Sequence, residues 1–215
     1  MKLTLNDEDR ARLDQLIAKA EKQTGAQIVI ATVKRSDSYA EIPWIAFAFG
    51  ISVAGFIVFL TDLFVLKWIS NSLVLISLGT TLAVGIFLAF LTIVSPVIAR
   101  IFLAKSRREV ETKQYAESLF LNHELFATKG RRGVLLLISQ FERHIVILPD
   151  KGLQNNLNKT VLEKIITEMV PVLRKGQLAK AMETGIALLS AELPSGFETG
   201  KENELSNEII EEEGV

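Results

Sequence analysis

The side chains best placed for chemistry are two aspartates, each of which follows a segment that is typical of a β-strand. Asp37 comes after the apolar run Gln27–Val33, and Asp150 comes after the run His144–Leu148. Aspartates at strand exits can bind a divalent cation such as calcium or act as nucleophiles. They can equally be turn residues that bond to nearby backbone. The sequence predicts Asp37 and Asp150 as candidate metal ligands, provided that their carboxyl groups lie within about 10 Å.

A second group with possible function is basic. Lys129, Arg131 and Arg132 surround Gly130 in a segment that is typical of a turn. In a chain tied to a membrane, clustered basic side chains contact anionic lipid headgroups. The alternative is a solvated turn without a partner. We interpret these three residues as candidate membrane-surface contacts.

The other polar motifs indicate no recognisable chemistry. Glu142 and Arg143 are expected to form a solvated ion pair in a hairpin turn. His123 and Glu124 do not make a zinc motif, because no second histidine follows at helical spacing. No glycine-rich phosphate loop, nucleophile elbow or paired cysteine motif is present in the sequence. The sequence therefore leaves catalytic residues unknown.

The elements that position these residues have two contrasting compositions. Mean hydropathy is +0.31 although 23% of the residues are charged. Two uncharged runs, Trp44–Leu60 and Leu73–Ala99, account for the apolar part and are long enough to span a bilayer. Both lack the polar stripe of a soluble helix, so a pair of buried helices in a soluble core is the weaker alternative. We predict two transmembrane helices, at about residues 44–66 and 73–99, with Pro96 able to kink the second.

Charge on either side of the two runs predicts the topology. The short connection between them carries one basic residue, Lys67. The outer flanks carry six, namely Lys34, Arg35, Arg100, Lys105, Arg107 and Arg108. Basic flanks stay in the cytoplasm. We expect a two-span protein of the cell membrane with both termini cytoplasmic and the bilayer as its first partner.

The polar remainder predicts one α/β domain that the membrane segments divide. Residues 1–40 contain a helix at about Asp7–Thr24, capped by Asn6 or Thr4 and ended by Gly25, and then one strand. A lone strand cannot satisfy its backbone groups, so we expect it to pair with Val134–Ser139 from the second piece, residues 105–193. The predicted fold is a small α/β/α sandwich split by a transmembrane helical hairpin at residues 41–104. Residues 194–215 are acidic and are expected to be a disordered tail.

Two segments of the polar remainder resemble the TPM domain family. The first is Glu-Lys-Gln-Thr-Gly-Ala-Gln-Ile-Val-Ile at residues 21–30, and the second is Gly133-Val-Leu-Leu-Leu-Ile-Ser139 followed by Arg143-His-Ile-Val-Ile147. The resemblance covers about residues 3–40 and 105–193. It implies an α/β/α sandwich around a small mixed sheet. It also implies a mixed functional record, which includes acid phosphatase activity, photosystem repair, receptor modulation and calcium binding.

Two functions from different classes follow. The first is a non-enzymatic, membrane-tethered module that docks proteins or assists membrane-protein complexes. The second is a metal-assisted phosphatase, as the resemblance implies for some members, with Asp37 and Asp150 as its leading metal ligands. A net charge of −1 argues against nucleic acid as a partner. We expect other membrane or membrane-associated proteins as partners.

Overall fold

The computed structural model describes residues 5–64, 71–194 and 209–214. The chain divides into two compact units, one formed by residues 1–37 and 109–215 and the other by residues 38–108. The first unit is an α/β body, and the second is helical. The chain leaves the α/β body soon after its first strand and returns to it within a later helix.

Helix α1 (Asp7–Thr24) begins and ends where the sequence predicts. The side chain of Asn6 accepts a hydrogen bond from the backbone N–H of Asp9, the third helical residue, at 2.6 Å, and Gly25 ends the helix at φ 66°. The buried Glu21 carboxyl accepts a hydrogen bond from the backbone N–H of Ile28 at 2.8 Å and so ties the helix to the first strand. Burial raises the pKa of Glu21 to about 7, although this hydrogen bond opposes the shift.

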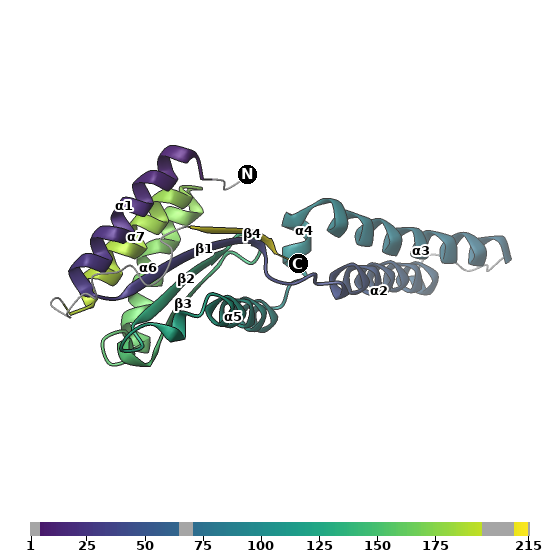
Figure 1. Cartoon of the computed structure of the whole chain (residues 1–215). Coiled ribbons are helices and arrows are strands. Elements are labelled where there is room, and N and C mark those ends of the chain that lie inside the picture. The colour runs from purple at the N-terminus through teal and green to yellow at the C-terminus, as the bar shows by residue number, and fades with distance from the viewer. Residues whose placement is uncertain (1–4, 65–70, 195–208, 215) are drawn as a thin grey trace. The chain divides into compact units, whose positions relative to one another are not determined.

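Four strands of the described residues form one mixed sheet in the order β3-β2-β1-β4 (Figure 1). They are β1 (Gln27–Arg35), β2 (Gly133–Ser139), β3 (His144–Pro149) and β4 (Ile210–Gly214). β2 and β3 are antiparallel neighbours, which confirms the predicted hairpin. β1 is parallel to both β2 and β4.

The pairing of β1 with β2 joins the two halves of the domain. Its register runs from Gln27 beside Gly133 to Val33 beside Ser139, which confirms the predicted pairing. Neither partner is near the other in the sequence. The α/β body therefore forms only when segments on both sides of the helical unit come together.

Strand β4 corrects the expectation of a disordered tail. Residues 210–214, which we expected to be disordered, extend the sheet beside β1. The remaining tail residues, 195–208 and 215, lie outside the described part of the chain. The three glutamates that made the segment look like a solvated tail have partners on α1, on β1 and on a helix of the opposite layer.

Helices cover both faces of the sheet (Figure 1). On one face, α1, α6 (Lys159–Arg174) and α7 (Leu178–Glu192) enclose a core that includes Ile28. On the other face, α5 (Lys105–Asn122) packs on a second core that includes Val29. Successive strand residues point to opposite faces, so the apolar run of β1 fills both cores. The α/β/α class is confirmed.

The helical unit consists of α2 (Glu41–Phe64), α3 (Asn71–Val94) and α4 (Pro96–Ile101). We expected helices at about 44–66 and 73–99, and residues 65–66 of the first lie outside the described residues. The second does not continue to residue 99. Ser95 has an extended backbone, and Pro96 starts a new helix, because proline disfavours a helical conformation in the residue before it.

Both long helices are apolar enough to cross a membrane, and both leave their apolar side chains uncovered. Only 17% of the apolar window of α2 and 6% of that of α3 is buried. Phe56 is 61% exposed and Phe90 is 56% exposed. The core helix of a soluble protein is mostly buried, so this pair does not resemble one.

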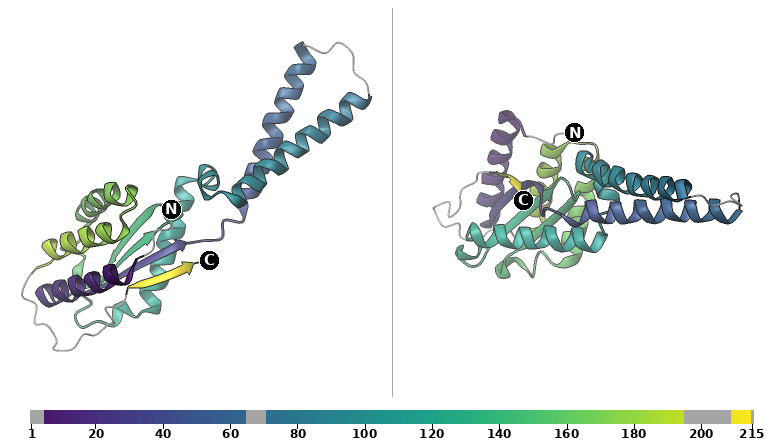
Figure 2. Two further views of the ribbon diagram at one scale, coloured as in Figure 1. Left: turned by 90° about the horizontal axis from the view of Figure 1, so that it is seen from above. Right: turned by 90° about the vertical axis from the view of Figure 1, so that its right-hand side faces the viewer.

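The two long helices lie side by side (Figure 2), and glycine residues lie at their contact. A Cβ atom at Gly50 would lie 2.9 Å from the Cα of Gly85, and a Cβ at Gly85 would lie 2.8 Å from the side chain of Ile51. Ala46 and Ala54, one turn on either side of Gly50, are also buried. Small residues allow close backbone approach between helices in lipid. The glycine contact joins two helices, so the spacing of glycines within either one did not reveal it.

Replacing Gly50 by leucine is expected to weaken the helical hairpin, because the new side chain collides with the backbone of α3. Overpacking of this kind costs about 1–3 kcal/mol. Thermal unfolding of the detergent-solubilised chain measures the loss. Gly55→Leu is the matched control, since no atom lies within 4 Å of a Cβ at that position. Equal melting temperatures for the two variants would contradict the close crossing.

Candidate functional site

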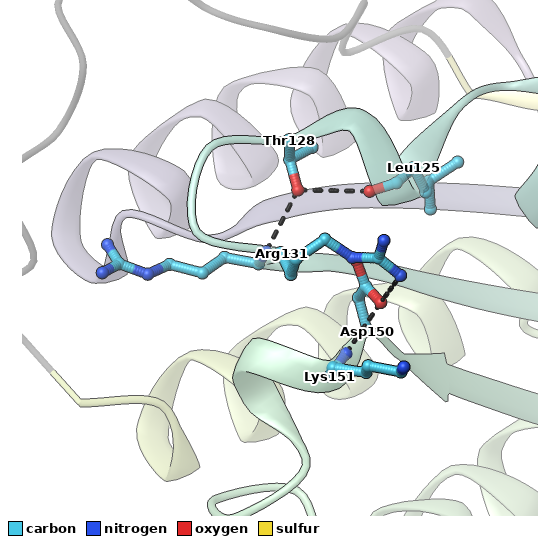
Figure 3. Close-up of polar contacts among 6 residues, drawn as sticks. Leu125, Thr128, Arg131, Asp150 and Lys151 are labelled. Carbon is cyan, nitrogen blue, oxygen red and sulfur yellow. Dashed lines mark hydrogen bonds and ion pairs between the residues drawn. The ribbon is translucent and has the colours of Figure 1, made fainter.

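The basic turn predicted from the sequence is a well-bonded loop between η1 (Leu125–Ala127) and β2 (Figure 3). The buried hydroxyl of Thr128 donates to the Leu125 carbonyl at 3.1 Å and accepts from the backbone N–H of Arg132 at 3.0 Å. Arg131 has a left-handed backbone at φ 57°, and its N–H donates to the Thr128 carbonyl at 2.9 Å. The loop therefore holds Arg131 in a fixed direction.

Arg131 binds Asp150 through two parallel hydrogen bonds. Its Nε lies 2.7 Å from Oδ2 of Asp150, and its Nη2 lies 2.9 Å from Oδ1 (Figure 3). The carboxylate is 4% exposed and also accepts the backbone N–H of Lys151 at 2.7 Å. The hydrogen bonds of Arg131 to Asp150, together with the negative charge of Asp150, raise the pKa of Arg131 against a smaller opposing effect of burial. Both carboxylate oxygens of Asp150 therefore accept hydrogen bonds that hold the loop in place.

Gly152 allows this pairing. It lies in η2 (Lys151–Leu153), and its N–H donates to the Arg131 carbonyl at 2.9 Å. A Cβ at this position would lie 2.3 Å from the Gly130 carbonyl oxygen and 2.6 Å from that of Arg131. Only glycine lets the two loops approach so closely.

The structure separates the two aspartates that we expected to share a cation. Asp150 donates its backbone N–H to the Gly133 carbonyl, at the end of the sheet where β1 begins. Asp37 follows the opposite end of β1. A strand of that length spans roughly 26 Å, which is far beyond two ligand distances of about 2.3–2.6 Å. Asp37 and Asp150 cannot bind one ion together, and the phosphatase hypothesis loses its leading pair of ligands.

The described residues also contain no cluster of three or more His, Asp or Glu side chains arranged to hold a metal ion.

The basic turn keeps positive charge at the surface. Within the turn, Lys129 is exposed and Arg132 is partly buried. Lys151, which follows Asp150, is also exposed. Part of the charge of Arg131 is balanced by Asp150. The predicted lipid contact of Lys129, Arg131 and Arg132 stays a prediction.

At the other end of the sheet lies a buried polar network that the sequence did not reveal. Glu142 is 1% exposed. Its Oε1 accepts the backbone N–H of Ser36 at 2.8 Å, and its Oε2 accepts the hydroxyl of Ser139. The hydroxyls of Ser36 and Ser139 are themselves 3.1 Å apart. This network joins the end of β1 to the β2–β3 hairpin at the point where the chain departs for α2.

The expectation that Glu142 forms a solvated pair with Arg143 is therefore wrong. Arg143 takes the left-handed conformation of the turn, at φ 51°, and is exposed. Glu142 instead folds back over its own hairpin toward Ser139, three residues earlier. The Ser-x-x-Glu spacing of Ser139 and Glu142 was the signal in the sequence for this contact. The second partner, Ser36, follows β1 on the other side of the insertion, so the local sequence did not reveal it.

These arrangements differ in what they can do chemically. The Ser36–Ser139–Glu142 network is a chain of two hydroxyls and a carboxylate, all nearly inaccessible to solvent. Its hydrogen bonds connect the end of β1 to the β2–β3 hairpin. The basic turn presents cationic side chains that can bind anionic groups. Among the described residues the basic turn is the better candidate for contact with another molecule.

Comparisons with known proteins agree with this architecture. A model of the TPM domain matches residues 2–51 and 98–192, leaving out the second half of α2 and all of α3. The solved structures include a match to the BA42 protein from the psychrophilic bacterium Bizionia argentinensis, determined by NMR. It is 15% identical, with a TM-score of 0.56 over 96% of this chain and 94% of that one. At this identity the likeness shows the fold alone. No curated protein matches.

Truncating Glu142 to alanine is expected to destabilise the α/β body by about 2–4 kcal/mol, because two buried donors lose their acceptor. Glu142→Gln retains one acceptor oxygen and should lose less. Hydrogen exchange of the β1 and β2 backbone in the detergent-solubilised chain measures the effect. The neighbouring change Arg143→Ala is the control and should stay within about 0.5 kcal/mol. Similar exchange rates for Glu142→Ala and the control would refute a structural role for the network.

Proposed function

The chain belongs to the TPM domain family, and from this premise we propose that it is a two-span membrane protein whose TPM domain faces the cytoplasm. The domain acts as a non-enzymatic module for protein docking or for the assembly and maintenance of membrane complexes. One observation carries the proposal. The two helices inserted into the domain expose large apolar side chains over most of their length.

Exposed apolar surface of this extent favours lipid as the solvent. In water, contiguous apolar surface on a monomer is normally limited to a few hundred Å². Helices satisfy their own backbone groups and so suit the hydrocarbon core. A cleaved signal sequence is a poor explanation for α2. Cleavage after α2 would remove β1, which lies between β2 and β4 in the sheet.

The charge distribution supports the cytoplasmic orientation. Six basic residues lie in the sequence segments that flank the pair of helices, against one in the connection between the two helices. Both flanks lie on the same side of a two-helix hairpin. The basic turn at Lys129, Arg131 and Arg132 then shares a compartment with anionic headgroups, which are its proposed lipid contact.

Fractionation tests the membrane insertion. The full chain should remain in the membrane pellet through a high-salt and alkaline wash and be released only by detergent. Replacing residues 41–104 by a flexible Gly/Ser linker should give a soluble protein with α/β circular dichroism, because β1 and β2 can still pair. Recovery of the intact chain in the soluble fraction without detergent would overturn the proposal.

The same preparation tests the orientation. A reporter inserted at Asn71 should lie outside the cell, whereas one fused to the C-terminus should lie in the cytoplasm. Identical results from the two positions would be incompatible with a two-span hairpin.

A further inference from the structure

The outer edge of β1 is occupied by a short acidic strand of the same chain. β4 runs parallel to β1, with Ile210 beside Ala31 and Gly214 beside Arg35 (Figure 1). A strand edge offers backbone N–H and C=O groups that an extended peptide can join. β4 therefore displays the kind of ligand that this edge accepts.

Each glutamate of β4 has a partner on a different element. The pairs are Glu211 with Arg10 of α1 at 2.9 Å, Glu212 with the hydroxyl of Tyr115 of α5, and Glu213 with Lys34 of β1. Burial, together with the hydrogen bond and charge of Glu212, raises the pKa of Tyr115, so its hydroxyl stays a donor. The edge thus selects acidic side chains at three successive positions.

Apolar and glycine positions add to this selection. Ile209 is 8% exposed within the core below α1, and Ile210 packs on the core below α5. Gly214 has φ 80°, and a Cβ there would lie 1.7 Å from the carbonyl oxygen of Arg35. The recognised pattern is Ile-Ile-Glu-Glu-Glu-Gly.

The contacts that hold β4 are individually weak. The Lys34 side chain is 52% exposed and that of Glu213 is 84% exposed, and exposed ion pairs contribute little. A five-residue strand at the edge of a sheet is also among the first elements to open. The covalent connection to α7 compensates, because a short tether supplies an effective concentration on the order of millimolar.

We propose that the β1 edge with Arg10, Lys34 and Tyr115 is a docking site for an extended acidic peptide of a partner protein, and that β4 is its tethered competitor. A partner's peptide has one strand to displace. A second copy of this chain would have to release its own strand in order to donate it. The inference rests on the proposed docking role and names the chemistry of its partner.

The test uses the full chain in detergent micelles and a fluorescent peptide with the sequence of residues 207–215. Gly214→Val prevents β4 from docking and removes the competitor. The peptide should then bind at least about tenfold more tightly to Gly214→Val than to the unaltered chain, given the effective concentration of the tether. Fluorescence anisotropy measures both affinities.

Further variants identify the groups that bind. In the Gly214→Val chain, Tyr115→Phe should weaken the peptide about tenfold, because it removes a hydrogen bond to a charged group. Arg10→Ala should also weaken the peptide, because it removes the ion pair with Glu211. Arg12→Ala is its matched control, since Arg12 pairs with Asp9 and Glu183 and not with β4. Arg12→Ala should leave the affinity unchanged. A peptide with valine in place of its glycine should bind weakly to every chain.

Any one of three binding results would overturn the inference: equal affinity for the unaltered and Gly214→Val chains, no effect of Tyr115→Phe, or equal binding of the valine peptide. Concentration-dependent dimers that exclude the peptide would make a second copy the occupant and also refute it. None of these results affects the detergent requirement of the full chain. Failure of the docking site and failure of membrane anchoring are therefore distinguishable.

Discussion

The parallel pairing of β1 with β2 is the constraint on which the rest of the structure depends. It joins segments that lie on either side of the helical unit, and its register runs over seven residue pairs. The backbone groups of β1 have no other source of partners on that side, and leaving them unpaired inside a protein is costly. The ends of the helical unit must consequently stay close enough for the sheet to close.

The same pairing organises both polar networks. At one end of the sheet, it brings the backbone N–H of Ser36 within hydrogen-bond distance of Glu142, where the chain leaves β1 for α2. At the other end, the start of β2 fixes the loop in which Arg131 meets Asp150. Each network uses a buried carboxylate to satisfy several donors, which is the usual condition for burying charge. Their positions at opposite ends explain why the two candidate aspartates cannot cooperate.

In both units, glycine occupies positions where two backbone segments come into close contact. Gly152 brings one loop onto the carbonyl groups of another, Gly214 lets β4 end beside Arg35, and Gly50 brings α2 against α3. In each case a Cβ atom at the glycine would collide with the backbone of a segment distant in the sequence. Such positions tolerate almost no substitution, whereas Gly55 and Gly79 face open space. Glycine content alone does not separate the two kinds.

The sequence by itself determined the elements and the class of the fold. Helix α1, the β2–β3 hairpin, the two apolar helices and the need for β1 to find a distant partner all follow from periodicity, capping residues and local composition. Tertiary structure decided the burial of Glu142, the separation of Asp37 from Asp150 and the ordering of β4. These depend on contacts between residues far apart in the chain. Local patterns report which conformation a segment prefers, but not which side chain it will meet.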